Sequence, residues 1–223
     1  MRPDLAAFID HTLLRPDAVR RDFERLCREA AQHSFATVCV NSAHVGLCTA
    51  LLEDCQLPVA ATVGFPLGAA SGASKAAEAA QAARDGAREL DMVCAIGWLK
   101  EGRRDAFEQD IRRVLDAAGE RALKVILETC LLSDDEKRRG AEWTREAGAA
   151  FVKTSTGFSS RGATEEDVRL LRQVVGPDFG VKASGGIRDA ASADRMIAAG
   201  ANRLGTSAGV AIVTGFEIEQ RGY

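Results

Sequence analysis

The lysines of this chain are few, and half of them lie in apolar surroundings. Only six of its 29 basic residues are lysines. Three interrupt short apolar runs: Lys124 in 123–127, Lys153 in 151–154 and Lys182 in 180–183. Arginine stays protonated, whereas a buried lysine can lose its proton and become a neutral amine. The placement therefore predicts amine chemistry. The alternatives are codon bias at the surface with chance retention of these lysines, or structural ion pairs in the core.

Short apolar or β-branched runs alternate along the chain with longer helical patterns. The strand-like runs are 8–13, 35–40, 59–64, 89–95, 122–128, 149–154, 179–184 and 202–205. The helical patterns are 18–32, 42–53, 73–86, 104–117, 134–147, 165–175 and 190–199. This alternation favours the α/β class and a (β/α)8 TIM barrel, with residues 1–223 as a single catalytic domain. A doubly wound sheet is the alternative.

Period-two alternation separates an apolar face of each strand from a polar one. Helices must cover the apolar face, so the polar side chains are expected to point into the barrel. The polar set comprises Asp10, Thr12, Thr37, Cys39, Asp91, Lys124, Glu128, Lys153 and Lys182. Many of them come late in their strands, at the carboxyl ends where active sites of such barrels lie.

Two inward lysines on neighbouring strands, Lys153 and Lys182, should disfavour each other's charge. A free lysine titrates near about 10.4, and burial beside a second ammonium group lowers that pKa. The lysine that loses its proton is a nucleophile able to form a Schiff base with a carbonyl. Asp91, inside the same barrel, is placed to act as proton donor and acceptor.

Further polar residues are expected to support this site. Lys124 and Glu128 lie four residues apart on one face of a predicted strand, which predicts a second charge pair shaping the cavity. A structural salt bridge and a direct catalytic role both remain open for that pair. Asp10 and Thr12 belong to the first strand, and Cys39 on the second is expected to be a thiol exposed to aldehyde.

Glycine- and serine-containing segments follow the last two predicted strands, at 184–188 and 205–209. In such barrels the loops after strands seven and eight commonly cradle a phosphate with backbone N–H groups. Glycine lets the backbone approach the ligand closely. The segments therefore predict a phosphate-bearing substrate, with ordinary turn glycines as the alternative.

Composition narrows the function classes. The net charge is −3 and no block of basic residues occurs, which argues against nucleic acid and membrane as partners. The six cysteines form no CxxC pair and the three histidines have no ligand spacing, so we expect no metal and no cofactor. The N-terminus has no signal-peptide pattern and no apolar run reaches spanning length, which predicts a cytoplasmic protein.

Several segments together resemble deoxyribose-phosphate aldolases, class I aldolases on the same barrel. Segment 151–157 (FVKTSTG) resembles the family's Schiff-base signature, and 181–188 (VKASGGIR) resembles its second-lysine and phosphate motif. Segments 9–14, 89–93 and 123–129 are similar to other blocks of the family. The resemblance thus covers essentially the whole chain in order.

The resemblance implies reversible, metal-independent cleavage of 2-deoxy-D-ribose 5-phosphate to D-glyceraldehyde 3-phosphate and acetaldehyde. This is a lyase reaction of deoxyribonucleotide and carbohydrate catabolism. It implies that Lys153 forms the Schiff base, that Lys182 lowers its pKa and transfers protons, and that Asp91 is a proton donor and acceptor. It also implies a homo-oligomer. The implied phosphate-binding residues are Gly157, Gly185, Gly186, Gly205 and Ser207.

The sequence departs from the family pattern at Ala95, Ala208 and Arg161 but keeps the three catalytic candidates. Two other hypotheses remain: a Schiff-base aldolase for another phosphosugar, and a non-catalytic phosphosugar-binding barrel. Tyr223, the final residue, is either a frayed tail or a group that folds over the barrel mouth to assist proton transfer.

The other three lysines lie outside the predicted strands. They are Lys75, Lys100 and Lys137. We expect them to be replaceable by arginine.

Overall fold

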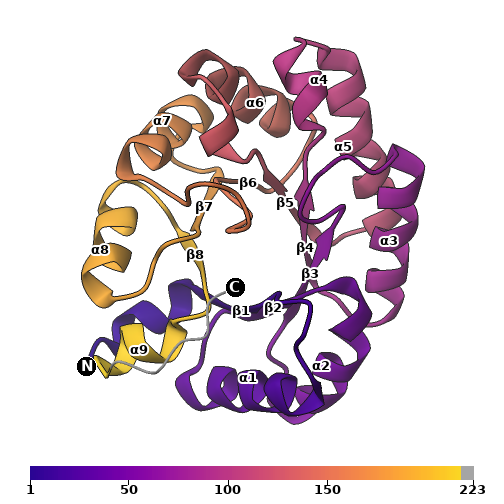
Figure 1. Ribbon diagram of the computed structural model, residues 1–223. Coiled ribbons are helices and arrows are strands. Elements are labelled where there is room, and N and C mark those ends of the chain that lie inside the picture. The colour runs from indigo at the N-terminus through magenta and orange to yellow at the C-terminus, as the bar shows by residue number, and fades with distance from the viewer. Residues whose placement is uncertain (217–223) are drawn as a thin grey trace.

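The computed structural model describes residues 1–216, which form a closed parallel barrel (Figure 1). Neighbouring strands pair in sequence order, and β8 closes the ring against β1. The strands are β1 (Ile9–Leu13), β2 (Thr37–Val40), β3 (Val59–Val63), β4 (Glu89–Val93), β5 (Ala122–Ile126), β6 (Phe151–Lys153), β7 (Gly180–Ser184) and β8 (Arg203–Thr206). The predicted (β/α)8 fold is confirmed, and each strand ends within two residues of its expected bounds.

Helices surround the strands on the outside of the barrel (Figure 1). They are α1 (Arg20–His33), α2 (Val45–Leu51), α3 (Gly72–Arg84), α4 (Ile96–Lys100), α5 (Arg104–Ala118), α6 (Asp134–Glu146), α7 (Glu165–Val175), α8 (Ala190–Ala198) and α9 (Gly209–Thr214). Short 3₁₀ turns are η1 (Pro3–Phe8), η2 (Ser42–His44), η3 (Glu53–Cys55) and η4 (Thr129–Leu131). Helices α4 and α9 are not among the predicted helical patterns, because helices of one to two turns carry too little periodic signal.

Helices α6, α7 and α8, like α3, begin at side chains that accept hydrogen bonds from otherwise unpaired backbone N–H groups. Ser133 caps α6, Thr164 caps α7 and Asp189 caps α8. Such caps stabilise the first helical turn and fix where the preceding loop ends. Among the loops fixed in this way are those after β5, β6 and β7, which carry much of the candidate site.

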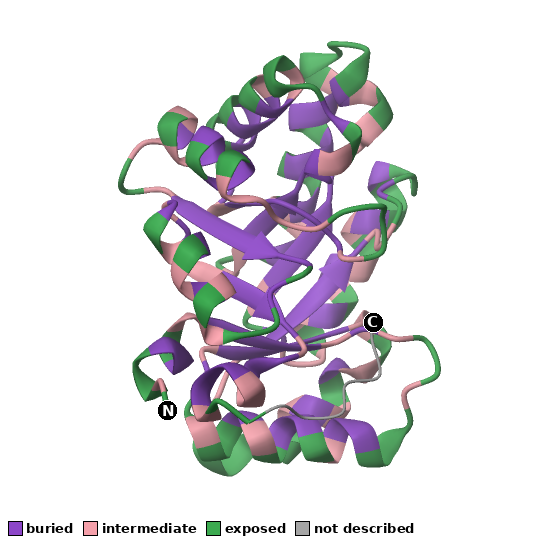
Figure 2. Ribbon diagram, turned by 60° about the vertical axis from the view of Figure 1, so that its left-hand side comes forward, coloured by how far each residue is buried: buried purple, intermediate pink, exposed green. Residues whose placement is uncertain are grey.

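Strand residues are buried on both faces, while the helices bury one side and expose the other (Figure 2). Outward side chains such as Leu90, Val125 and Val181 belong to the hydrophobic core between strands and helices. The barrel interior differs, because it holds ionisable side chains that are also fully buried, including Asp91 and Lys182. Buried charges are stable only when they are paired and hydrogen-bonded, so the interior must contain an organised network.

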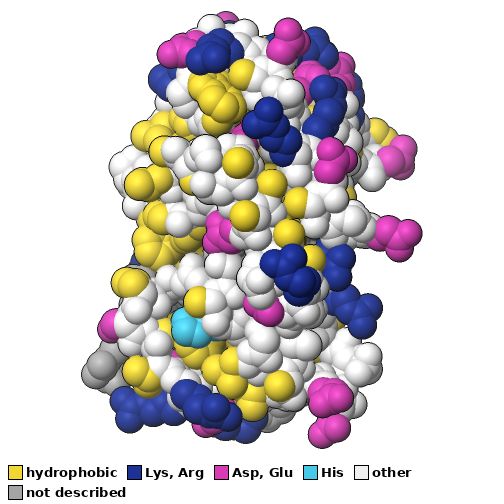
Figure 3. Space-filling model, turned by 90° about the vertical axis from the view of Figure 1, so that its right-hand side faces the viewer, with side chains coloured by type: hydrophobic (Ala, Val, Ile, Leu, Met, Phe, Trp, Pro, Cys, Tyr) yellow, Lys and Arg dark blue, Asp and Glu magenta, His cyan; other side chains and the backbone are white. Residues whose placement is uncertain are grey.

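The outer surface carries charges of both signs. On the face to the right of Figure 1, lysine and arginine side chains lie interspersed with aspartate and glutamate (Figure 3). Within residues 1–216, no helix is both long and apolar enough to cross a membrane.

Candidate active site

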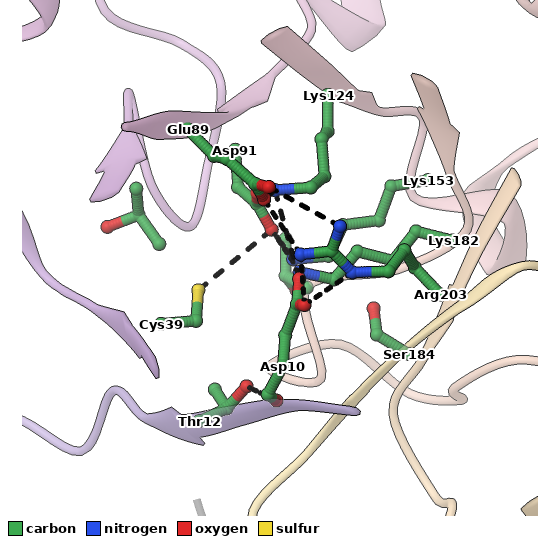
Figure 4. A network of polar contacts seen from close by, with 12 residues as sticks. Asp10, Thr12, Cys39, Glu89, Asp91, Lys124, Lys153, Lys182, Ser184 and Arg203 are labelled. Atoms are coloured by element: carbon green, nitrogen blue, oxygen red, sulfur yellow. Dashed lines mark hydrogen bonds and ion pairs between the residues drawn. The ribbon is translucent and has the colours of Figure 1, made fainter. Parts of the chain in front are cut away.

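Asp91 occupies the centre of a buried charge network inside the barrel (Figure 4). Its Oδ1 accepts a hydrogen bond from Lys124 Nζ at 2.8 Å. Its Oδ2 accepts from both Lys153 Nζ and Lys182 Nζ, each at 2.7 Å. These four side chains are at most 3% exposed. One carboxylate is thus shared by three amines from β5, β6 and β7.

Asp10, Glu89 and Arg203 extend the network (Figure 4). Lys182 Nζ also donates to Asp10 Oδ2. Arg203 Nε donates to Asp10 Oδ1 at 2.7 Å, and Arg203 Nη2 donates to Glu89 Oε2 at 2.9 Å. Lys124 Nζ lies 2.5 Å from the same Glu89 oxygen. These contacts join β1, β4, β5, β7 and β8 in one network.

Cations outnumber carboxylates in the network when every group is charged. Among the described residues, four cationic groups face three carboxylates: Lys124, Lys153, Lys182 and Arg203 against Asp10, Glu89 and Asp91. An uncompensated charge in a buried site is unfavourable. Loss of one proton from a lysine would balance the network.

Lys153 is the lysine of the network whose pKa is lowered. Burial lowers this pKa from the ordinary value of 10.5. The charge of Lys182 lowers it further, whereas the carboxylate of Asp91 raises it. Burial also disfavours the charged form of Lys182, but Asp10 and Asp91 raise its pKa. Burial alone would raise the pKa of Asp91, yet the three surrounding lysines hold it well below its usual range. The network therefore disfavours the charged form of Lys153, while it favours the charged forms of Asp91 and Lys182.

Cys39 and Thr12 border the network from β2 and β1. The Cys39 Sγ lies 3.9 Å from Asp91 Oδ2 and has no exposed surface. Burial raises the pKa of this thiol, with Asp91 adding to the effect, so its sulfur stays protonated. Thr12 Oγ1 donates to the backbone oxygen of Asp10 at 2.8 Å. This hydrogen bond lies within β1, beside Asp10.

Three glycines bring the loops after β6 and β7 into backbone contact. Gly157 and Gly185 have φ angles of +87° and +84°, which favour glycine. A Cβ on Gly185 would lie 2.9 Å from Gly162 Cα and 3.4 Å from Gly157 Cα. At Gly186, a Cβ would meet no described atom within 4 Å. The two loops therefore pack closely, with exposed backbone at Gly186.

Gly205 and Ser207 lie on the other side of this region. A Cβ on Gly205 would lie 3.0 Å from Lys182 Cε and 2.9 Å from Ser184 Cβ. The absence of a side chain at Gly205 therefore gives Lys182 room to reach Asp10 and Asp91. Ser207 follows β8 and lines a cavity of about 570 Å³ together with Thr12 and residues of α1, and none of the network residues lines this cavity.

Comparison with known proteins shows the family of this chain. The profile of the DeoC/LacD family aldolases matches residues 5–215. The chain belongs to this aldolase family. It is 54% identical over 221 residues to deoxyribose-phosphate aldolase 1 of Bacillus licheniformis, covering 99% of each chain. It is also 54% identical over 211 residues to the deoxyribose-phosphate aldolase of Coprothermobacter proteolyticus, covering 95% of this chain and 96% of that relative.

A solved structure supports the same assignment. The tetrameric deoxyribose phosphate aldolase of Aeropyrum pernix matches with a TM-score of 0.90 at 34% identity. The match covers 96% of this chain and 91% of the other.

One predicted contact of the aldolase site is wrong. Lys124 was predicted to pair with Glu128, but β5 ends at Ile126 and Glu128 has a left-handed φ of +59°. The period-two alternation therefore stops before Glu128. Lys124 turns to Asp91 and its neighbours, whereas Glu128 accepts hydrogen bonds from Thr156 N at 3.3 Å and from Thr156 Oγ1.

Two of the three lysines expected to be replaceable are buried. Lys75 has no exposed surface and donates to Asp110 Oδ2 at 2.7 Å. Lys137 is 6% exposed and lies 2.7 Å from Asp167 Oδ1. Lys100 is exposed, as expected. Lysine scarcity by itself therefore does not separate a catalytic lysine from a structural one.

Sequence reasoning missed Glu89 and Arg203 as members of the network. They begin β4 and β8, whereas the predicted site lies at the carboxyl ends of the strands. The alternation contained a signal, because Glu89 shares its phase with Asp91 and Arg203 shares its phase with Gly205.

The three departures from the family pattern lie beside the site loops. Ala95 precedes α4, Ala208 precedes α9, and Arg161 Nη2 lies 3.8 Å from Asp167 Oδ2. Tyr223 lies outside the described residues. Among residues 1–216, no group of three or more His, Cys, Asp or Glu side chains is arranged to hold a metal ion.

Proposed function

We propose that this aldolase reversibly cleaves 2-deoxy-D-ribose 5-phosphate to D-glyceraldehyde 3-phosphate and acetaldehyde through a Schiff base at Lys153. The observation that carries the proposal is that Lys153 and Lys182 share Asp91 Oδ2 in a buried network with one surplus cation. The names of the two curated relatives support the substrate.

The first half of the reaction forms the covalent intermediate. The neutral amine of Lys153 attacks C1 of the open-chain sugar and forms a carbinolamine. Lys153 Nζ and Lys182 Nζ both donate to Asp91 Oδ2. Asp91 and Lys182 are therefore close enough to accept and donate the protons that allow water to leave the carbinolamine. The product of this half is a protonated Schiff base between Lys153 and C1.

The second half of the reaction breaks the C2–C3 bond of the sugar. The Asp91 carboxylate accepts the proton of the C3 hydroxyl, directly or through water, and the C2–C3 electron pair moves toward the iminium. D-Glyceraldehyde 3-phosphate leaves, and the resulting enamine takes up a proton at C2. Hydrolysis of the new Schiff base then releases acetaldehyde and regenerates the Lys153 amine.

Binding of the phosphate is proposed for the loops after β6, β7 and β8. The close backbone packing of Gly157 with Gly185 and the open backbone of Gly186 support this role. Ser207 provides a hydroxyl on the adjacent loop. The absence of a side chain at Gly205 leaves room for Lys182, and this role has direct geometric support. Contact of Gly205 with the phosphate is part of the proposal.

The test is to trap the Schiff base. Wild-type protein treated with acetaldehyde and borohydride should carry a reduced two-carbon adduct on Lys153, located by peptide mass spectrometry. Lys153→Arg, treated identically, should carry none at that position. A wild-type protein that binds inorganic phosphate but gains no adduct at Lys153 would contradict the proposed mechanism and favour a non-catalytic phosphosugar-binding barrel.

Two wider expectations belong to the same proposal. A homo-oligomer is supported by the tetramer of the Aeropyrum pernix relative, and light scattering of the purified protein tests it. A cytoplasmic location is supported by the free thiols of all six cysteines, since disulfides are rare in reducing compartments. Fractionation of the source cells tests the location.

A further inference from the structure

Glu128 makes its hydrogen bonds away from the lysine network. It is 3% exposed, its Oε1 accepts from Thr156 N at 3.3 Å, and its Oε2 accepts from Thr156 Oγ1. Its φ of +59° is uncommon for a residue with a side chain, so the surrounding contacts must hold it. These contacts tie the end of β5 to the loop after β6.

Thr156 transmits this constraint to the next two residues. Its Oγ1 accepts a hydrogen bond from Phe158 N at 3.0 Å, which closes a tight turn around Gly157. Gly157 lies against Gly185 of the loop after β7. The conformation of Gly157 is therefore set on one side by Thr156 and on the other by Gly185.

The ring of Phe158 meets the ring of Phe65, from the loop after β3, edge to face with centroids 5.2 Å apart. The Phe65 loop is itself held in place. Gly64 N donates to Glu78 Oε2 at 2.8 Å, and a Cβ on Gly68 would lie only 2.1 Å from Cys94 O. The loop after β6 is thus constrained at Glu128, at Gly185 and at Phe65.

We propose that Glu128 is a positioning residue that, through Thr156, holds Gly157 and Phe158 so that the loop after β6 fits the phosphate end of the substrate. The inference rests on the proposed function and deepens it. Glu128 contacts no group of the lysine network through a hydrogen bond among the described residues. Its loss therefore weakens the binding of phosphorylated substrate and leaves Schiff-base formation intact.

Three variants test the proposal on paired substrates, 2-deoxyribose 5-phosphate and unphosphorylated 2-deoxyribose. Glu128→Gln removes the charge of the acceptor, and Thr156→Val removes the hydroxyl that donates to it. Each variant should raise KM for the phosphorylated sugar about tenfold. The catalytic efficiency on unphosphorylated sugar should change less than about threefold, as should the rate of the Lys153 adduct with acetaldehyde. Thr156→Ser keeps the hydroxyl and should behave like wild type.

Glu136→Gln is the matched control, because Glu136 Oε2 also accepts from a backbone N–H, that of Ser133 at 2.8 Å, on the exterior of the barrel. It should leave both substrates unaffected. Equal losses on both sugars in Thr156→Val, or no loss on either, would overturn the positioning role. Failure of the wild type to form the Lys153 adduct would instead overturn the proposed function as well, so the two failures are distinct.

Discussion

Lys75 and Lys153 are both buried lysines that donate to an aspartate at 2.7 Å, yet their surroundings differ. Lys75 lies outside the strands, where it joins α3 to Asp110 of α5 in a pair that balances its own charge. Lys153 lies inside the barrel and shares Asp91 with Lys182 and a third lysine. The comparison shows that burial beside a carboxylate does not mark a reactive lysine, and the reactivity proposed for Lys153 depends on its shared carboxylate and the surplus cation.

The largest expected effect is the loss of catalysis in Lys153→Arg. Arginine stays protonated and cannot act as the amine nucleophile, so turnover should fall at least about 10⁴-fold. The melting temperature should fall, because arginine cannot lose the proton whose loss balances the buried network. A variant that retains turnover would show that Lys153 is not the nucleophile and would remove the distinction between the two lysines.

The reverse outcome is expected for Asp110→Ala. Removal of one partner leaves Lys75 as an uncompensated buried charge, which costs about 3–5 kcal/mol of unfolding free energy. Turnover per folded molecule should be unchanged, because the pair lies outside the barrel. Denaturant unfolding measures the unfolding free energy. The turnover rate, divided by the number of sites titrated with acetaldehyde and borohydride, gives turnover per folded molecule. Loss of adduct formation in the folded variant would contradict a purely structural role.

A third prediction concerns pH dependence in Lys182→Met. Lys182 lowers the pKa of Lys153, and catalysis needs neutral Lys153, so activity should rise with pH through that pKa. Without Lys182, the pKa of Lys153 rises and the rising limb of the kcat/KM profile moves to higher pH. Loss of proton transfer should lower turnover at neutral pH about 10²–10³-fold. An unmoved limb would mean that Lys182 does not set this pKa.

The smallest effect is expected at Lys100, which is exposed and pairs with Glu136. Lys100→Arg keeps the charge at a solvated site, where substitutions usually change stability by no more than about 0.5 kcal/mol. Turnover and unfolding free energy should both match wild type within error. Lys75→Arg, measured in parallel, should lower the unfolding free energy. Gly64 packs so closely on Lys75 that a Cβ added to Gly64 would lie 3.0 Å from Lys75 Cε, which leaves no room for the wider guanidinium.

Much of the site could be read from local patterns. The alternation of Lys153 with Val152 and of Lys182 with Val181 placed both amines inside the barrel, because side chains on a strand change face at every residue. The same rule failed for Glu128, since the strand ended two residues earlier and the backbone turned into a left-handed conformation. Lys75 was misjudged because helix periodicity does not reveal which helix packs against it.

The sequence by itself determined the order of strands and helices, the barrel, and the presence of Lys153, Lys182 and Asp91 on its inner face. These follow from periodicities of two and 3.6 residues, which are local properties of the chain. Only the tertiary structure decided that Asp91 is shared by three lysines and that Arg203 reaches Asp10, 193 residues away. Closure of the barrel buries Lys153 and sets its distance from Lys182, and both the burial and the neighbouring charge lower the pKa of Lys153.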